Sequence, residues 1–381
     1  MAAAFAERWQ SCAFQQTDYA KEKIYSAILS VIVSSKRPHE LQLNGNQPLL
    51  KDIRLNDQDV AVVIRALREC SDITLLNLSY NDITVEGIKH LAEYLKDQVC
   101  TITSLNLSYN NFGADGAILL SDALQFNRTL KAITLDGNPI GRKGGIQVAA
   151  MLQVNRTLTT LGLARTDLDT DCIIAVATVL HGNSTLECVD LTRPLLHSKQ
   201  EEPTIHISKM LQVNFALREL HLSQHGMTDT GMEWICRMLK GNSTLSHLDV
   251  SGNSLSRDGA GHMAQLLKSN SPLQVLDMSF NRIEDDGLVY LSDALCTNYV
   301  LQRLNVCSNS AGDPGLCQLA NTLKRNTTIA TILIWGNKIG EPTCNHFRSL
   351  LETGRLKATN IDVKPYVVDG ITCLARSEVQ C

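Results

Sequence analysis

One pattern recurs along most of this chain and constrains its fold more than any other feature. The pattern is L-x-x-L-x-L-x-x-N-x-I/L/F-x-x-x-G, and it returns almost every 28 residues. Its third apolar position falls at Leu78, Leu107, Leu135, Leu163, Leu191, Leu222, Val250, Met278, Val306 and Ile334, with weaker members at Leu43 and Val363. Self-similarity at a fixed period is the signature of stacked repeats. The sequence therefore predicts one extended repeat array.

Each repeat combines two periodicities. The L-x-L segment alternates, as in LLNLSYN at residues 75–81, and this is typical of a short strand. The second half places Ile88, Leu91, Ala92 and Leu95 at helical spacing. Parallel strands lie about 4.8 Å apart and packed helices about 8–10 Å apart, so a stack of such units bends toward its strands. We expect an α/β horseshoe solenoid, with a parallel concave β-sheet and convex α-helices.

The repeated Asn and Gly have structural tasks in this interpretation. The Asn amide is expected to bond backbone groups where the chain turns out of the strand. This Asn ladder comprises Asn81, Asn110, Asn138, Asn253, Asn281, Asn309 and Asn337. The Gly that follows, at positions 87, 116, 144, 231, 259, 287 and 315, lies where a side chain would crowd the neighbouring repeat.

The chain resembles a known family at these repeats. LNLSYNDITVEGIKHLAEYL, LNLSYNNFGADGAILLSDAL and LDMSFNRIEDDGLVYLSDAL are similar to the ribonuclease-inhibitor-type leucine-rich-repeat proteins, and the likeness covers roughly residues 40–363. The resemblance implies a leucine-rich-repeat horseshoe that binds partners on its concave face or rims. The family also includes the Ran GTPase-activating protein, axonemal subunits and the sensor halves of nucleotide-binding innate receptors, so fold alone does not fix function.

The two ends of the array are expected to be capped. Residues 1–38 place Ile24, Tyr25, Ile28 and Val31 on a helix suited to covering the first repeat. The leucine-rich-repeat solenoid then spans residues 39–355. Residues 356–381 are predicted to form a degenerate last repeat and a C-terminal cap, closed by Val363, Val367, Val368 and Leu374.

The repeat loses its regularity between residues 163 and 225. The Asn position becomes Thr166, Pro194 and His225, and one step lengthens to 31 residues. Pro194 and Pro203 flank charged residues, which indicates an irregular exposed loop at residues 194–204. Drift in a tolerant repeat and a loop specific to a partner both explain this stretch.

Composition excludes several classes of partner. The net charge of -4 provides no basic field for nucleic acid or anionic lipid, and no run of about 18 apolar residues suggests a membrane span. The first residues lack the features of a secretory signal, and the 12 cysteines form no CxxC pair. We therefore expect an intracellular protein of the cytoplasm or nucleus, with the ciliary axoneme as an alternative location.

Five Asn-x-Ser/Thr sequons that share one position in the repeat match the glycosylation signal of secreted proteins. They begin at Asn127, Asn155, Asn183, Asn242 and Asn326, and the first apolar residue of the next repeat follows each one. This position indicates helix ends, where Asn tolerates a left-handed conformation.

No cofactor, metal or catalytic residue is predicted. The nearest approach to a metal cluster is His221, His225 and His247, which adjacent repeats bring toward one strand surface, but no zinc spacing is present. A binding-surface or incidental role fits these histidines better. The chain also lacks the GxxxxGK[ST], GxSxG and HExxH motifs.

Side chains beside the third apolar residue point away from the core and are candidates for contact with a protein partner. Aromatic and arginine side chains dominate protein interfaces. The partner-binding candidates are Tyr80, Tyr109, Arg165, Arg193, His221, Asp249, Asp277, Phe280 and Trp335.

These observations favour a non-catalytic scaffold or adaptor that binds one or more proteins on the concave face and rims, with no nucleic acid, membrane or small-molecule substrate. One alternative is a GTPase-activating protein for a Ran-like GTPase, although that relative has a long acidic tail and this chain ends in ARSEVQC. Another is a structural subunit of a large assembly such as the axoneme. A receptor sensor half would need an ATPase domain upstream.

Overall fold

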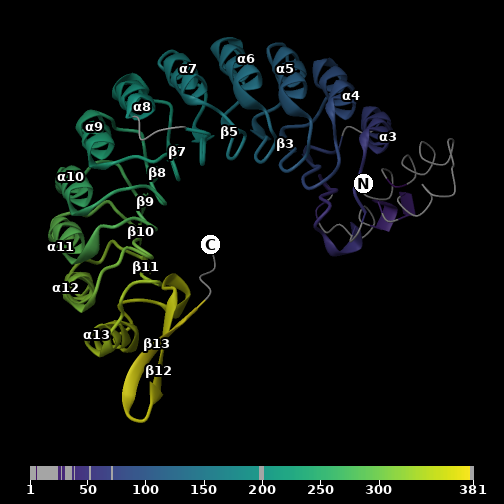
Figure 1. The fold of residues 1–381 in the computed structure, drawn as a ribbon. Coiled ribbons are helices and arrows are strands. Elements are labelled where there is room, and N and C mark those ends of the chain that lie inside the picture. Colours follow the sequence, from purple (N-terminus) through teal and green to yellow (C-terminus); the bar gives the residue numbers. More distant parts are fainter. Residues whose placement is uncertain are drawn as a thin grey trace. The chain divides into compact units, whose positions relative to one another are not determined.

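The computed structural model describes residues 6, 25–26, 28–30, 37, 39–50, 53–69, 72–196 and 201–377. The chain divides into two compact units, Met1–Leu195 and Leu196–Cys381. Within each unit, short strands alternate with helices (Figure 1).

The first unit contains a parallel sheet whose strands follow chain order. Neighbouring strands pair in register, so that Leu76 lies opposite Leu105. The strands are β1 (Glu40–Gln42), β2 (Leu75–Asn77), β3 (Ser104–Asn106), β4 (Ala132–Thr134), β5 (Thr160–Gly162) and β6 (Cys188–Asp190). The helices are η2 (Pro48–Leu50), α3 (Asp57–Arg68), α4 (Val85–Lys96), α5 (Gly113–Leu124), α6 (Gly141–Val154) and α7 (Thr170–Leu180).

The second unit repeats this plan and ends in a hairpin. Its parallel strands are β7 (Glu219–His221), β8 (His247–Asp249), β9 (Val275–Asp277), β10 (Arg303–Asn305) and β11 (Thr331–Leu333). Its helices are α8 (Glu202–Val213), α9 (Asp229–Leu239), α10 (Arg257–Lys268), α11 (Glu284–Leu295), α12 (Asp313–Leu323), α13 (Glu341–Glu352) and η3 (Ala358–Asn360). The antiparallel strands β12 (Val363–Val368) and β13 (Ile371–Arg376) close the described part of the chain.

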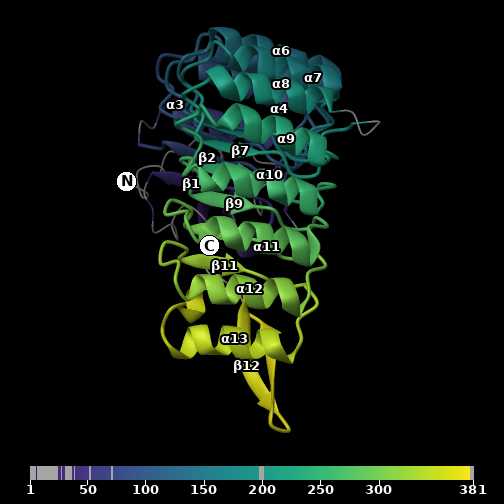
Figure 2. The ribbon, with the colours of Figure 1, turned by 90° about the vertical axis from the view of Figure 1, so that its left-hand side faces the viewer.

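The leucines of the repeat form the core between sheet and helices. Leu76 and Leu78 from the strand segment, and Ile88, Leu91 and Leu95 from α4, are all buried. Consecutive helices of the second unit pack side by side on one side of its sheet, as Figure 2 shows for α10 to α13. In the part of the chain that the structure describes, helices α3 to α7 and α8 to α13 lie on this one side of their sheets, and we call the opposite side of each sheet the open face. The predicted fold class, an α/β solenoid of strand–helix repeats with a parallel sheet, is confirmed. Among the described residues, none of the helices combines the length and apolarity that crossing a bilayer requires.

A carboxylate from one repeat caps the helix of the next. Asp229 Oδ1 accepts hydrogen bonds from the backbone N–H groups of Ser256 and Gly259, 2.8 and 2.9 Å away. Exposed N–H groups and the helix dipole both favour a negative charge at a helix N-terminus. A Cβ at Gly259 would lie 2.5 Å from the same carboxylate oxygen. The repeated Gly therefore makes room for this inter-repeat cap.

The N-terminal prediction lies largely outside the described residues. Tyr25 and Ile28 are helical and buried, whereas Ile24 and Val31 are not described.

The C-terminal segment differs from a further strand–helix repeat. After η3 the chain forms the β12–β13 hairpin, in which Val363 pairs with Arg376. Val363 is buried, but Val367 and Val368 are exposed, so these two side chains do not close the last repeat as expected.

The irregular loop is shorter than predicted. Residues 197–200 are outside the described part, and α8 already begins at Glu202. Pro203 and Thr204 are buried in its first turn. Proline is tolerated there because the first N–H groups of a helix have no partner within the helix.

The sequon asparagines mark helix ends, but none of them is left-handed. Asn155 has φ -65° and ψ 135°. Asn127 is buried; its Nδ2 donates to Leu95 O at 2.7 Å, and its Oδ1 accepts from Leu130 N at 2.8 Å. These amides join one helix end to the next repeat, which leaves no room for a glycan on the folded chain.

Candidate functional site

The Asn ladder binds backbone atoms at the end of each strand. Asn281 is buried, and its Nδ2 lies 3.0 Å from Met278 O and 3.1 Å from Val250 O in the preceding repeat. Its Oδ1 accepts a hydrogen bond from Leu255 N at 3.1 Å. Asn81, Asn110, Asn138, Asn253, Asn309 and Asn337 make equivalent bonds. These side chains belong to the scaffold and are not free to contact a partner.

Most polar residues of the open face also form hydrogen bonds within the protein. Asp249 Oδ1 accepts from Ser251 N at 2.8 Å, and Asp277 Oδ1 accepts from Ser279 N at 2.8 Å. Such bonds to the backbone two residues on stabilise a turn. Asn77, Asn106, Asp190 and Asn305 make the same bond.

A second row of side chains follows the strands, two residues after the third apolar position. In the repeats from Tyr80 to Gly336, the residue at this position has a left-handed backbone conformation. Three repeats place glycine there: Gly137, Gly252 and Gly336. The others place Tyr80, Tyr109, Arg165, Arg193, Gln224, Phe280 and Ser308, with φ between 53° and 58°. We call these seven residues the left-handed row. Five of them are partner-binding candidates from the sequence.

Two tyrosines of the left-handed row form a stacked pair in the first unit. The rings of Tyr80 and Tyr109 have centroids 4.5 Å apart and an interplanar angle of 13°. A Cβ at Gly137 would lie 2.5 Å from Tyr109 Cδ1, so the ring lies over the glycine of the next repeat. Both rings remain 38% exposed. The pair presents an aromatic surface that the protein only partly covers.

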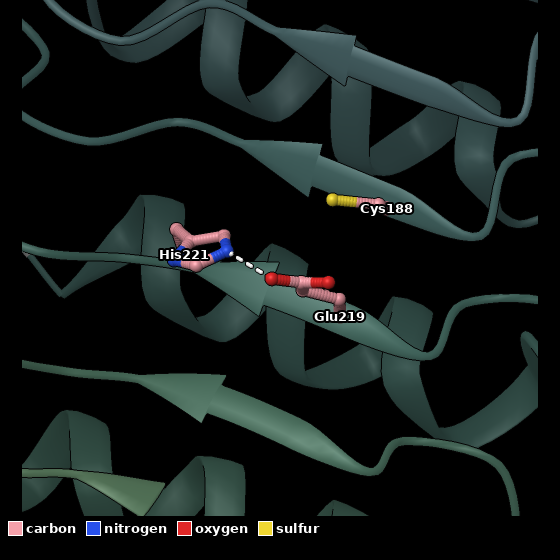
Figure 3. A group of neighbouring side chains, drawn as sticks. All are labelled: Cys188, Glu219 and His221. Atoms are coloured by element: carbon pink, nitrogen blue, oxygen red, sulfur yellow. Dashed lines mark hydrogen bonds and ion pairs between the residues drawn. The ribbon is translucent and has the colours of Figure 1, made fainter. Parts of the chain in front are cut away.

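Four titratable side chains meet on the open face of the second unit. In the register of β7 and β8, Glu219 lies opposite His247, and His221 lies opposite Asp249. Glu219 Oε1 is 2.8 Å from His221 Nε2 and 3.0 Å from His247 Nδ1. His221 Nδ1 is 3.5 Å from Asp249 Oδ2. We call these residues the His–Glu square; Figure 3 shows its β7 members, while the Cys188 also drawn there belongs to β6 of the first unit.

His225 is not part of this square. It is buried after the end of β7, at the position that Asn occupies in regular repeats. Its backbone N–H donates a hydrogen bond to Asn253 Oδ1 at 3.0 Å. The structure therefore brings together two of the three histidines singled out in the sequence.

The environment of the open face shifts several pKa values. Burial lowers the pKa of His247 and outweighs the opposing effect of Glu219. Burial would raise the pKa of Asp249, but hydrogen bonds from His221 and Ser251 outweigh it and lower the pKa. Burial, assisted by the nearby charge of Asp249, raises the pKa of Asp277. Neighbouring carboxylates of this face thus differ in their affinity for a proton.

Phe280 and Trp335 line one hollow of about 940 Å³ in the second unit. Leu333 and Arg376 also line it. Phe280 is 65% exposed, more than the half-buried Trp335. Asp362 is buried, and its Oδ2 accepts a hydrogen bond from Trp335 N at 3.0 Å. Phe280 is therefore the more accessible of the two aromatic candidates.

Another set of exposed aromatic side chains, not predicted from the sequence, lies outside the left-handed row. Phe126, Phe215 and Tyr299 are 70%, 54% and 68% exposed. Each is next to a buried Asn that links a helix end to the following strand. In the sequence, these aromatic residues could have been found by their position next to the Asn at the helix end.

Comparison with known proteins identifies the repeats. A family model described as "Leucine Rich repeat" matches residues 69–92, 100–121, 213–236, 241–264 and 269–292. Leucine-rich repeat-containing protein 34 of Mus musculus is 48% identical over 46 residues, and that of Homo sapiens is 41% identical over 46 residues. The match covers 12% of this chain and 11% of the mouse relative, so the chain spans only about a tenth of the curated relatives' length in these matches.

Two solved structures are partly similar to the chain. One is the actin-binding site 2 of leiomodin-1, with 20% sequence identity and a TM-score of 0.34 over 44% of this chain and 91% of that one. The other is TLR13 in complex with ssRNA13, with 18% identity and a TM-score of 0.45 over 73% of this chain and 38% of that one. The family model and the structure agree on these segments: residues 69–92, 100–121, 213–236, 241–264 and 269–292 are leucine-rich repeats, and the strand–helix units around them follow the same plan.

Proposed function

We propose that this chain is a non-catalytic protein-interaction scaffold whose partners dock along the left-handed row and the adjoining open faces. The observation that carries the proposal is the identity of the residues in that row. Stacked repeat proteins generally use their extended surfaces to bind other proteins.

The residues of the left-handed row carry backbone strain that the fold does not require. A non-glycine residue in the left-handed region is strained by about 1 kcal/mol or more. Gly137, Gly252 and Gly336 demonstrate that the repeat accepts glycine at this position. Large side chains at the other repeats therefore favour a role outside folding.

The side chains of the row have few tasks within the protein. The guanidinium groups of Arg165 and Arg193 are exposed and form no hydrogen bond or ion pair with any residue that the structure describes. Phe280 projects a largely exposed ring beside the hollow of the second unit. Aromatic and arginine residues are enriched among the side chains that contribute most to protein binding.

We also propose an intracellular location. All nine cysteines in the described part of the chain are free thiols, four of them buried. In secreted proteins, such cysteines are more often oxidised to disulfides. Mass spectrometry of the protein from its native tissue, after alkylation without reduction, is expected to find these thiols unpaired; disulfides would contradict this location.

Glycine substitution separates binding from folding in the row. Phe280→Gly and Arg165→Gly remove the side chain and relieve the left-handed strain, so the melting temperature is expected to stay unchanged or rise. Partners captured by affinity purification are then made recombinantly, and their Kd values are measured. We expect at least a tenfold weaker Kd for one of the two variants, which is about 1.4 kcal/mol.

Phe126→Ser is the matched control, because it removes an equally exposed aromatic ring from outside the row. Its partner affinities are expected to match those of the unchanged protein. Unaltered binding by both glycine variants, or loss of binding in the control alone, would show that the interface lies outside the left-handed row.

A further inference from the structure

The open face of the second unit changes from polar to apolar at its last strand. On β7 to β10, the residue before the third apolar position is polar: His221, Asp249, Asp277 and Asn305. In β11 this residue is Leu333. The residue after the third apolar position is small in the same four repeats: Ser223, Ser251, Ser279 and Cys307. In the last repeat it is Trp335, so two large apolar side chains replace polar or small ones here.

These two side chains line the hollow of about 940 Å³ that Phe280 also lines. The β12–β13 hairpin, which packs beside α13 (Figure 1), contributes Arg376 to the same hollow. Phe280 is 65% exposed and Trp335 is half-buried, so the folded chain leaves aromatic surface uncovered at this site. Binding pockets are typically hollows of about 300–1,000 Å³ with an apolar lining and a few polar groups. The hollow has this size and this kind of lining.

The hollow is lined by one carboxylate and one guanidinium, and they differ in what they already bind. Asp362 is buried, and its Oδ1 accepts a hydrogen bond from Ile334 N at 2.9 Å. Its Oδ2 accepts from Trp335 N at 3.0 Å and from the Cys307 thiol at 3.0 Å. Arg376 is exposed, and its guanidinium forms no hydrogen bond or ion pair with any residue that the structure describes. The charge in this hollow that a ligand can still pair with is therefore a cation.

We propose that this hollow binds a short extended segment of a partner protein in which an acidic residue adjoins a large apolar residue. The inference rests on the proposed function and specifies the chemistry of the partner at one site. The acidic side chain pairs with Arg376, because a guanidinium forms strong charge-assisted hydrogen bonds with a carboxylate. The apolar side chain packs against Phe280 and Trp335, since burying aromatic rings contributes strongly to interface stability.

A second hollow, of about 380 Å³, shares Trp335 with the first and lets an extended segment continue past this ring. Three apolar side chains line it: Ile339, Ile371 and Leu374. Glu341 also lines it and would repel a second carboxylate. The acidic residue of the segment therefore belongs in the first hollow, and an apolar neighbour belongs in the second.

The test uses random dodecapeptides displayed on phage and selected on the immobilised full chain. Enriched sequences are expected to share an acidic residue next to a large apolar residue. The most enriched peptide is then synthesised with a fluorescent label, and fluorescence anisotropy measures its Kd. Arg376→Gln and Trp335→Ser are each expected to weaken this Kd at least tenfold. Serine occupies the position of Trp335 in three preceding repeats, so the fold accepts it there, and circular dichroism checks that both variants are folded.

Arg325→Gln is the matched control, because Arg325 is also exposed but lies just beyond the end of α12, outside both hollows. Its Kd for the peptide is expected to equal that of the unchanged protein. An exchange of charges tests the ion pair itself. Arg376→Glu is expected to lose the acidic peptide and to bind a version in which lysine replaces the acidic residue.

Several results would overturn the inference: no enriched peptide, enrichment without an acidic residue, or a peptide Kd that Arg376→Gln and Trp335→Ser leave unchanged. Self-association of the chain that Trp335→Ser abolishes, measured by sedimentation, would assign the hollow to a second copy and overturn it too. If the glycine variants of the left-handed row weaken the binding of protein partners but Arg376→Gln and Trp335→Ser do not, the proposed function stands and this inference fails. Loss of the peptide in Trp335→Ser, with partner Kd values unchanged in both glycine variants, would instead contradict the left-handed row.

Discussion

The asparagine at the end of each strand serves several backbone groups at once. Asn281 donates to the carbonyls of Val250, Met278 and Ser279 and accepts the N–H of Leu255. The strand turns toward the helix here and cannot pair these groups within the sheet. Because the site is buried, water does not replace the amide.

Asn281→Ala is therefore expected to destabilise the protein by about 2–4 kcal/mol, since leaving one buried polar group without a partner costs about 1–3 kcal/mol. Urea unfolding followed by circular dichroism measures this change. Asn321→Ala, on the exposed surface of α12, is the control and is expected to change stability by less than about 0.5 kcal/mol. Equal effects at the two positions would contradict a special role for the ladder.

Sequence reasoning reached this residue because the same amide recurs at the same offset from the repeat leucines. Five residues of the left-handed row were already partner-binding candidates, but their shared backbone conformation was not predicted, because Tyr80 and Arg165 have no shared side-chain chemistry. The property that these residues share is a positive φ angle. In the sequence, only the glycines at positions 137, 252 and 336 indicate it. Of the His–Glu square, only Glu219 was not foreseen, because Glu219 and His247 meet through strand register and not through a local motif.

At the scale of the element, the start of several helices depends on the repeat before it. The Asp229 carboxylate, in the first turn of α9, binds the N–H groups of Ser256 and Gly259 at the start of α10. Asp285 does the same for Gly312 and Gly315 at the start of α12. At α10 and α12, helix capping is thus a contact between repeats.

Two glycines of α10 should respond oppositely to alanine. Gly259→Ala is expected to lower the free energy of unfolding, because its Cβ would lie 2.5 Å from Asp229 Oδ1. Gly261→Ala, two residues along the same helix, would meet only Tyr290 at 3.4 Å and is expected to gain about 0.5–1 kcal/mol from helix propensity. Chemical denaturation of both variants measures the difference. Stabilisation by both substitutions would refute the crowding argument.

The strands and helices could be predicted from the spacing of apolar residues within each repeat. A spacing of two residues specifies the strand, and a spacing of three and four residues specifies the helix. The elements that escaped prediction lack this spacing. Pro203 suggested a loop, although proline also suits the first turn of a helix, where α8 begins. The β12–β13 hairpin lies beyond the last regular repeat, where the 28-residue period no longer informs the pairing of Val363 with Arg376.

At the scale of the molecule, each repeat is stabilised mainly by the repeats beside it. Leu276 in β9 is buried and lies opposite Leu248 in β8 and Leu304 in β10. In such arrays, stability is approximately a sum of repeat and nearest-neighbour contributions. A local defect is therefore expected to act mainly on adjacent repeats.

Leu276→Ala tests this locality. The lost contacts are expected to cost about 2–5 kcal/mol, and amide hydrogen exchange should accelerate in β8, β9 and β10 while β2 and β3 of the first unit change little. Leu105→Ala in β3, which removes an equally buried leucine, is the reciprocal control and should accelerate exchange around β2 to β4. Mass spectrometry of peptic fragments resolves the two patterns. A uniform acceleration along the chain in both variants would instead mean that the described repeats unfold as one cooperative body, because nearest-neighbour coupling alone predicts that the effect declines with distance from the substituted repeat.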